Sequence, residues 1–190
     1  STFEYAMIGI CLTGIDGSFL MVNPALTQML GYSTSEMKKL TFEELTHPDD
    51  IRISHQKVKR MMDHPGESVQ FEKRYRKKDG DYIWASVGSF LLRDDQANPE
   101  YFITHIENIT DRKLAESQLI ANEVKFRTFF EQVADYVMIL EPRESGLYIV
   151  DMNEAAHKIH GYTRAEMLNQ SLDLLDETGV TADDERINMI

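Results

Sequence analysis

The first hundred residues alternate between short apolar runs and turn-forming residues, and this pattern predicts five strands. The apolar runs 8–13 and 19–22 flank Asp16 and Gly17, a hairpin signal, and predict an antiparallel pair of strands. Three longer runs rich in β-branched and aromatic residues follow after an interval without strand character. They predict strands at 68–77, 81–93 and 101–109.

The interval between the second and third strands carries helix signals. Asn23 is a favourable N-cap, Pro24 occupies the first helical position, and Gly31 follows the end of this first helix. Two capping boxes predict two further short helices, and they pair Ser33 with Glu36 and Thr41 with Glu44.

A longer helix is predicted to open at His47–Asp50 and to end at Pro65 and Gly66. Apolar residues recur along it at the spacing of one helical face. The predicted inward stripe consists of Ile51, His55, Val58 and Met62. These elements make the unit an α+β domain in which two strands, four helices and three strands follow one another.

Part of this unit occurs twice. Residues 23–45 align without a gap with residues 153–175 and agree at seven positions. The shared pairs are Asn23/Asn153, Ala25/Ala155, Gly31/Gly161, Tyr32/Tyr162, Glu36/Glu166, Met37/Met167 and Leu45/Leu175.

The order of the elements and five local motifs resemble those of the PAS domain family with its C-terminal PAC motif. The motifs are Val22–Ala25, Gly31–Ser33, Thr46–Asp50, Glu72–Gly80 and Glu107–Lys113. The resemblance covers residues 3–113 and implies a five-stranded antiparallel sheet with short helices on one face. It divides the chain into a first PAS domain with its PAC motif (1–110), a connecting signalling helix (111–129) and the N-terminal part of a second PAS domain (130–190).

The second copy matches the family only as far as its short helices. It has no Lys-Asp-Gly hairpin and no closing Ile-Thr motif, so three sheet strands are missing if the chain stops at Ile190. The apolar faces of Val137, Ile139, Ile149, Ile159 and Leu168 are then expected to lack a cover. We therefore expect a truncated second unit.

The segment Asp111–Gln132 contains no Gly or Pro and is predicted to be one helix. Apolar residues and one Asn follow a heptad spacing along it, at Ala115, Leu119, Asn122, Phe126, Phe129 and Val133. The spacing is compatible with a coiled coil between two copies of the chain, and equally with a helix that lies on the sheet of its own domain. Either arrangement predicts that Phe126 and Phe129 are buried. The resemblance implies that such a helix passes a signal.

Composition excludes several classes of function. A net charge of −12 opposes binding to nucleic acid, whose affinity comes from Lys and Arg. The single cysteine, Cys11, excludes an internal disulfide, and no apolar run is long enough for a membrane span. The abrupt start at Ser1, without a leader, is typical of a segment of a longer protein. These features together predict a cytoplasmic location.

No catalytic constellation emerges from the sequence. The six His residues show no metal-ligand spacing, and no metal site is predicted. Cys11 is placed as a buried small side chain, Asp49 and Asp50 as a helix cap, and Asp94 with Asp95 as a turn. We therefore expect that this segment is not an enzyme.

The candidate function is binding and relay. Strand alternation places Ile83, Ala85, Val87 and Ser89 on one face, and alignment with PAS domains turns this face toward a pocket. The candidate pocket lining is His55, Val58, Val69, Phe71, Val87, Ser89, Thr104 and Ile106. A small organic ligand and a fully packed interior are both compatible with this wall.

His55 resembles in its spacing from Pro48 the haem-ligating histidine of oxygen-sensing PAS domains. The simpler interpretation is a histidine at the helix rim that bonds a neighbour. Phe71 stands where those sensors carry an arginine, and the flavin signature Asn-Cys-Arg-Phe is absent.

The family closes with Asp-Ile-Thr, whereas this chain has Asn108, Ile109 and Thr110. An amide cannot form a salt bridge. Either the coupling into Arg112 and the linker is then expected to be looser, or the charge is expected to come from Glu107 or Asp111.

The sequence is thus interpreted as a sensory segment of a bacterial-type signalling protein. It is expected to bind a small ligand, to form a homodimer, or both. Its output domain, a histidine kinase or a cyclic-dinucleotide enzyme, is expected elsewhere in the same parent chain. A ligand-free PAS dimerisation scaffold is the alternative.

Overall fold

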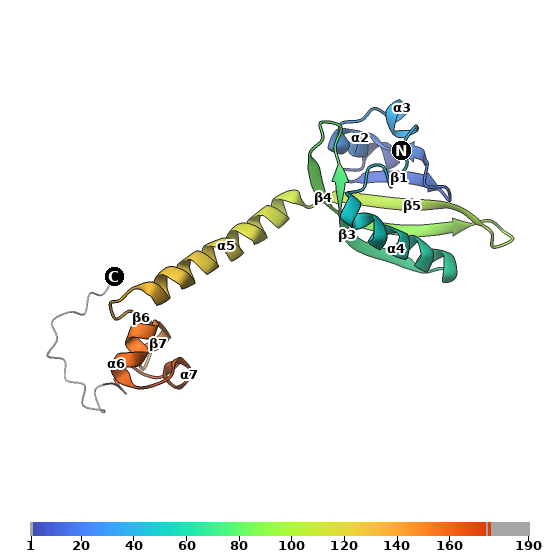
Figure 1. Cartoon of the computed structure of the whole chain (residues 1–190). Coiled ribbons are helices and arrows are strands. Elements are labelled where there is room, and N and C mark those ends of the chain that lie inside the picture. The colour runs from blue at the N-terminus through green and yellow to red at the C-terminus, as the bar shows by residue number, and fades with distance from the viewer. Residues whose placement is uncertain (1, 174, 176–190) are drawn as a thin grey trace. The chain divides into compact units, whose positions relative to one another are not determined.

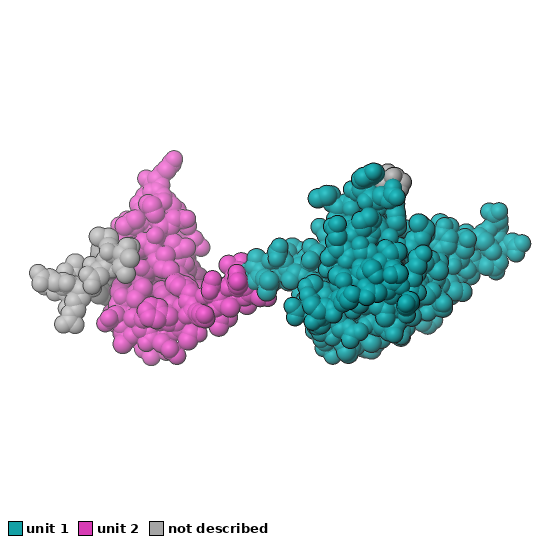
Figure 2. All heavy atoms as spheres, turned by 90° about the horizontal axis from the view of Figure 1, so that it is seen from above, with its two compact units in different colours: residues 1–116 teal, residues 117–190 magenta. Residues whose placement is uncertain are grey.

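The structure is a computed structural model, and it describes residues 2–173 and residue 175. The chain forms two compact units, 1–116 and 117–190, which Figure 2 colours separately. Each unit has its own apolar core.

The first unit is built on a five-stranded antiparallel sheet in the order β2-β1-β5-β4-β3 (Figure 1). Its strands are β1 (Gly9–Gly14), β2 (Phe19–Val22), β3 (Ser68–Arg76), β4 (Tyr82–Arg93) and β5 (Pro99–Asn108). All five predicted strands are confirmed, with ends that differ from the sequence pattern by one or two residues.

The helices of this unit are α1 (Thr2–Tyr5), α2 (Pro24–Leu30), α3 (Thr34–Met37), the short 3-10 helix η1 (Pro48–Asp50) and α4 (Ile51–Asp63). Asn23 caps α2, Gly31 ends it in the left-handed conformation, and Ser33 caps α3. The prediction of a third short helix after Thr41 is wrong. Thr41 and Glu44 make the bonds of a capping box, but residues 42–45 form a turn between the bridge residues Thr41 and Thr46.

The inward stripe predicted for α4 is also wrong in phase. Ser54 and Met61 are the buried residues, whereas His55 and Met62 are exposed. The Ser54 hydroxyl donates to the Asp50 carbonyl at 2.9 Å, so a polar residue satisfies itself inside the helix and can face the core. The buried face of α4 is therefore shifted by one residue from the face that the apolar spacing predicts.

Asn23 ties four segments of the first unit together, and its side chain is fully buried. Its Oδ1 accepts bonds from the backbone N–H of Ile10 at 2.9 Å and of Leu26 at 3.0 Å. Its Nδ2 donates to the carbonyls of Phe3 at 3.1 Å and Ile8 at 2.9 Å. One side chain thus satisfies backbone groups of α1, β1, α2 and the segment between α1 and β1.

Asn153 repeats this arrangement in the second unit. Its Oδ1 accepts from the N–H of Val137 and of Ala156, both at 3.1 Å. Its Nδ2 donates to the carbonyls of Val133 at 3.3 Å and Asp135 at 2.9 Å. The repeat seen in the sequence is therefore a repeat of hydrogen-bonding geometry.

The described part of the second unit contains the strands β6 (Met138–Arg143) and β7 (Gly146–Met152) and the helices α6 (Glu154–His160) and α7 (Arg164–Met167). Ile149 was expected to lack a cover but is fully buried. It packs in a small core because α6 and α7 fold over β7, and the core consists of Ile149, Met152, Ala156, Met167 and Leu175. Residues 174 and 176–190 of the predicted second domain lie outside the described residues.

The predicted connecting helix is α5, which runs from Thr110 to Gln132. Phe130 near its end is buried, but Leu119 and Phe129 are each 70% exposed and Phe126 is 47% exposed. Within this single chain, the predicted burial of Phe126 and Phe129 is therefore not met.

Replacing Asn23 with Ala should lower the free energy of unfolding of the first unit by about 3 kcal/mol or more, because several buried backbone groups lose their partner at about 1–3 kcal/mol each. Urea denaturation followed by the fluorescence of Trp84, the only tryptophan, measures this unit alone. Gln56→Ala, on the exposed surface of α4, is the control and should change stability by less than about 0.5 kcal/mol. Equal urea midpoints for the two variants would contradict the role of Asn23.

Candidate functional site

A cavity of about 50 Å³ lies between α4 and the face of the sheet that α4 covers. This volume has room for about three to five water-sized groups. Its walls come from every strand of the first unit, from α4 and from Phe42. The lining residues are Cys11, Thr13, Phe19, Phe42, Ser54, Lys57, Val58, Met61, Phe71, Lys73, Tyr75, Val87, Ser89, Phe102 and Thr104.

The structure brings most of the candidate pocket residues to this cavity. Five of them line it, namely Val58, Phe71, Val87, Ser89 and Thr104. Val69 and Ile106 are buried in the apolar clusters beside the cavity and do not line it.

His55 lies outside the cavity, which corrects its place in the candidate lining. Its side chain is 52% exposed, and its Nε2 lies 2.6 Å from the Glu43 carboxylate. Since α4 turns Ser54 inward, His55 points to the rim and bonds a neighbour. The geometry does not fit an axial haem ligand, and a cavity of about 50 Å³ is far smaller than haem or flavin.

The predicted pocket lining does not include Lys73 on β3, although this residue lines the cavity. Its side chain is only 2% exposed and lines the cavity. The ammonium donates to Thr46 Oγ1 at 2.8 Å and, more weakly, to Ser54 Oγ at 3.4 Å. It also lies 4.3 Å from the ring centroid of Tyr75 and 5.2 Å from that of Phe42. Within the described part of the chain, no carboxylate forms an ion pair with it.

Burial governs the ionisation of the cavity walls. Desolvation lowers the pKa of Lys73 from its ordinary 10.5 to about 7, although the charge of the Asp50 carboxylate opposes this shift. Burial raises the pKa of the Cys11 thiol to about 11 and raises the pKa of Tyr75 well above its ordinary value. Both groups are therefore neutral near pH 7, and Lys73 is the group on these walls that changes charge there.

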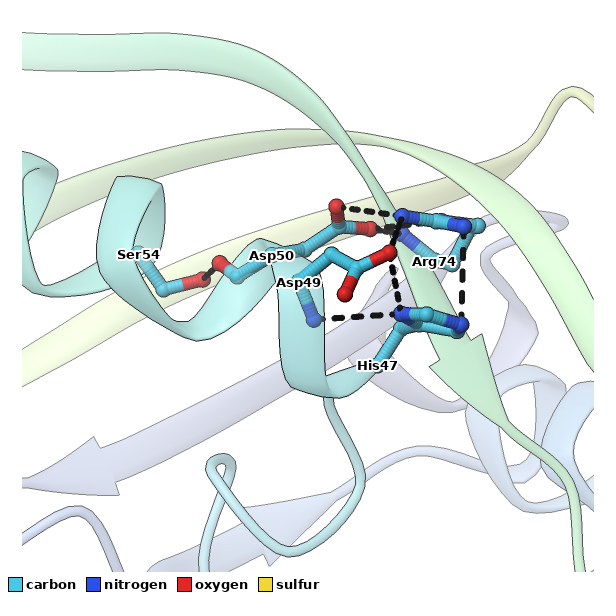
Figure 3. A network of polar contacts seen from close by, with 5 residues as sticks. All are labelled: His47, Asp49, Asp50, Ser54 and Arg74. Atoms are coloured by element: carbon cyan, nitrogen blue, oxygen red, sulfur yellow. Dashed lines mark hydrogen bonds and ion pairs between the residues drawn. The ribbon is translucent and has the colours of Figure 1, made fainter.

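A network on the far side of β3 fixes the start of α4 (Figure 3). Arg74 donates from Nη2 to Asp50 Oδ1 at 2.8 Å and from Nε to Oδ2 at 2.9 Å, and its backbone N–H donates to Oδ2 at 2.8 Å. The hydrogen bonds from Arg74 lower the pKa of Asp50. His47, which accepts from the N–H of Asp49 through Nδ1, takes the capping position. The expected helix cap at Asp49 and Asp50 is therefore wrong for Asp50, whose carboxylate binds Arg74.

The same strand holds the first turn of α5. Glu72 accepts from Arg112 Nη2 at 2.8 Å and lies 2.6 Å from Lys113 Nζ, and these bonds lower the pKa of Glu72. The Trp84 ring has the Arg74 guanidinium 5.2 Å and the Lys113 ammonium 5.5 Å from its centroid. Contacts thus run from Asp50 through Arg74 and Trp84 to the start of α5.

Asn108 replaces the anchoring Asp of the resembled motif with a local turn. Its Oδ1 accepts from the Thr110 N–H at 2.9 Å and from the Thr110 hydroxyl at 2.6 Å. The Thr110 Oγ1 in turn accepts from the backbone N–H of Trp84 at 3.0 Å. The charge that anchors Arg112 comes from Glu72, and the expectation that Glu107 or Asp111 supplies it is wrong.

Two models of the same protein family match successive segments of the chain. The model described as "PAS fold" matches residues 19–106, and the model described as "PAS domain" matches residues 124–189. The chain belongs to the PAS domain family. The resemblance inferred from the local motifs is confirmed, and the chain contains tandem PAS units.

The curated relatives are signalling proteins that carry similar PAS regions. The probable diguanylate cyclase DgcE of Escherichia coli is 39% identical over 116 residues, which make up 61% of this chain and 10% of the relative. The sensor histidine kinase TmoS of Ectopseudomonas mendocina is 29% identical over 119 residues, which make up 63% of this chain and 12% of the relative. The aligned segment therefore spans only about a tenth of the length of either relative.

A solved structure supports the fold. The PAS domain of a protein from Colwellia psychrerythraea matches with a TM-score of 0.54 at 20% identity, over 58% of this chain and 92% of that chain. Within the described residues of the PAS segment, no helix combines the length and apolar character needed to cross a bilayer.

Replacing Lys73 with Met should stabilise the first PAS unit most below pH 7. The native state binds fewer protons than the unfolded state between about pH 7 and pH 10.5, so the stability of the original protein rises with pH in this window. At about 1.4 kcal/mol per pH unit, the advantage of Lys73→Met should shrink by about 2 kcal/mol between pH 7 and pH 9.

Guanidinium denaturation at both pH values, followed by Trp84 fluorescence, measures this difference. Lys39→Met, at an exposed position, serves as the control and should show no pH-dependent difference. A constant difference between Lys73→Met and the original protein across this window would mean that Lys73 stays protonated in the fold.

Proposed function

We propose that the first PAS unit senses a small ligand in the cavity beneath α4 and passes its state to α5, which controls an output domain of the parent protein. The observation that supports this proposal best is the position of Lys73. A buried ammonium that has no ion-pair partner among the described residues lines the cavity. Its two neighbours along β3, Glu72 and Arg74, take part in the contacts that reach α5.

The proposed relay follows from the alternation of side chains along β3. Lys73 points into the cavity, while Glu72 and Arg74 lie on the opposite face. Arg74 holds the start of α4 through Asp50, and Glu72 holds the start of α5 through Arg112. A ligand that displaces α4 or β3 therefore changes both contacts together.

The relatives suggest the kind of output. DgcE is a probable diguanylate cyclase, and TmoS is a sensor histidine kinase. We infer that the parent of this segment controls one of these two classes of enzyme, and that the segment itself performs no catalysis.

Ligand sensing is tested by extraction of the purified chain. Mass spectrometry of the denatured extract should reveal any ligand that stays bound through purification, and small molecules added to the purified chain should reveal a weaker ligand; the bound amount should fall when Val87→Trp fills the cavity. The absorbance of the folded protein checks for a coloured cofactor. An empty extract from a protein that also fails to bind any small molecule added to it would favour the alternative of a ligand-free scaffold.

The relay predicts that Glu72→Gln loosens the start of α5. The amide cannot pair with Arg112 and Lys113, so hydrogen exchange of the amides at 112–117 should become faster. The exchange of the amides in β4 should be unchanged. Glu100→Gln, at an exposed position of β5, is the matched control. Unchanged exchange at 112–117 in Glu72→Gln would exclude Glu72 as an anchor.

Dimerisation through α5 is part of the proposal because its heptad residues are exposed in the single chain. Leu119, Phe126 and Phe129 would form an apolar seam with a second copy, a surface that isolated proteins rarely leave open.

Phe129→Glu should convert a dimer to a monomer in light scattering at about 100 μM protein, because charges of like sign would meet across the seam. Val124→Glu introduces the same charge at an exposed apolar residue on the opposite side of α5 and should leave the mass unchanged. A monomeric mass for the original chain would overturn dimerisation by this helix.

A further inference from the structure

The walls of the cavity are electropositive. Lys57 and Lys73 both line it, and no Asp or Glu is among the lining residues that the structure describes. Lys73 approaches from β3 and is buried, whereas Lys57 approaches from α4 and is half-buried, with its ammonium 5.9 Å from the ring centroid of Phe71. An anion that enters beside Lys57 would meet a buried ammonium at the inner wall.

The charge of Lys73 is not balanced by the protein around it. An ammonium has three donors, and here two of them point to the neutral hydroxyls of Thr46 and Ser54. The carboxylate whose charge acts on it is that of Asp50, but both oxygens of that carboxylate accept bonds from Arg74. One donor and the positive charge of Lys73 are thus left for another partner.

The remaining polar groups of the wall are mostly occupied. The hydroxyls of Ser89 and Thr104 bond each other at 2.8 Å, and the Cys11 thiol lies 3.8 Å from the Thr13 hydroxyl. The other walls are apolar and include Met61, Val87 and Phe102. The cavity therefore offers one strong binding point for a negative group and an apolar surface for the rest of the ligand.

We propose that this cavity binds a small monocarboxylate of about three to five heavy atoms, such as acetate, with its carboxylate on the Lys73 ammonium and its alkyl group against Met61, Val87 and Phe102. The size follows from the cavity volume of about 50 Å³. A phosphate has no alkyl group to occupy the apolar wall, and a dicarboxylate, with at least six heavy atoms, exceeds this size. The inference rests on the proposed sensing function of the first unit and specifies its ligand.

Binding should be coupled to proton uptake. The pKa of Lys73 in the empty cavity is about 7, and a bound carboxylate favours its charged form. The other titratable groups that face Lys73 are Cys11 on β1, Tyr75 on β3, Lys57 on α4 and Asp50 at the end of η1. Burial raises the pKa of Cys11 and of Tyr75, and Arg74 lowers the pKa of Asp50, so none of these three changes charge between pH 7 and pH 9.

The test is calorimetric titration of the purified chain with sodium acetate, after dialysis at constant ionic strength. We expect saturable binding with a Kd no tighter than tens of micromolar, the ceiling for a ligand of four heavy atoms. The affinity should fall about tenfold per pH unit above pH 7. Lys73→Met should weaken binding at least tenfold, whereas Lys39→Met, which is exposed, should not change it. Lys57→Met measures the contribution of the outer lysine.

Acetamide, the neutral isostere, separates charge recognition from simple filling of the cavity. Weaker binding of acetamide by tenfold or more supports the proposal, and equal affinity overturns it. Sodium chloride at the same concentration should not compete, and competition by chloride would mean a general anion site without a place for the alkyl group.

The two levels of inference fail differently. If acetate does not bind but the denatured extract of the protein contains another small molecule, the monocarboxylate is wrong and ligand sensing stands. If acetate does not bind, the extract is empty and no other small molecule added to the protein binds, the monocarboxylate is wrong and ligand sensing fails with it.

Discussion

The bidentate pair between Asp50 and Arg74 is the interaction on which the sensory unit depends. It fixes the first turn of α4 to the outer face of β3, and the Arg74 backbone N–H adds a third bond to the same carboxylate. Helix α4 starts there, covers the cavity and places Ser54 in contact with Lys73. Without this anchor, neither the cavity nor the environment of the buried lysine would be defined.

Lys73 has the properties of a group kept for function at a cost in stability. A buried ammonium without a counter-charge destabilises a fold, and an apolar side chain of similar volume is often more stable in such a place. The first unit otherwise obeys the usual rules, with capped helices, a paired sheet and a closed apolar core. A violation of these rules inside a cavity is the pattern expected of a binding site.

Much of the fold could be predicted from the sequence because its signals are local. The N-cap at Asn23, the capping box at Ser33 and the strand alternation each depend on a few neighbouring residues. The candidate site could be predicted only in part. His55 was assigned inward because apolar spacing alone sets the phase of a helix, and the bond from Ser54 to Asp50 that sets the true phase has no sequence signature. Lys73 was missed because it stands in a run of charged residues that is typical of a solvated surface, although the alternation that places Phe71 inward also places Lys73 and Tyr75 there.

Contacts hold α5 near both of its ends, and its length is therefore constrained. Glu72 holds its first turn, and Asn153 holds the backbone just beyond its last turn at Val133. An α-helix turns by about 100° per residue, so an insertion of one residue between these anchors would turn the residues at the end of α5 by that angle about the helix axis. An insertion of seven residues restores the original direction to within about 20°. A change in the length of α5 therefore leaves the same face of the helix in place at its end only when the number of residues added or removed is close to a whole number of turns, as seven, eleven or eighteen residues are.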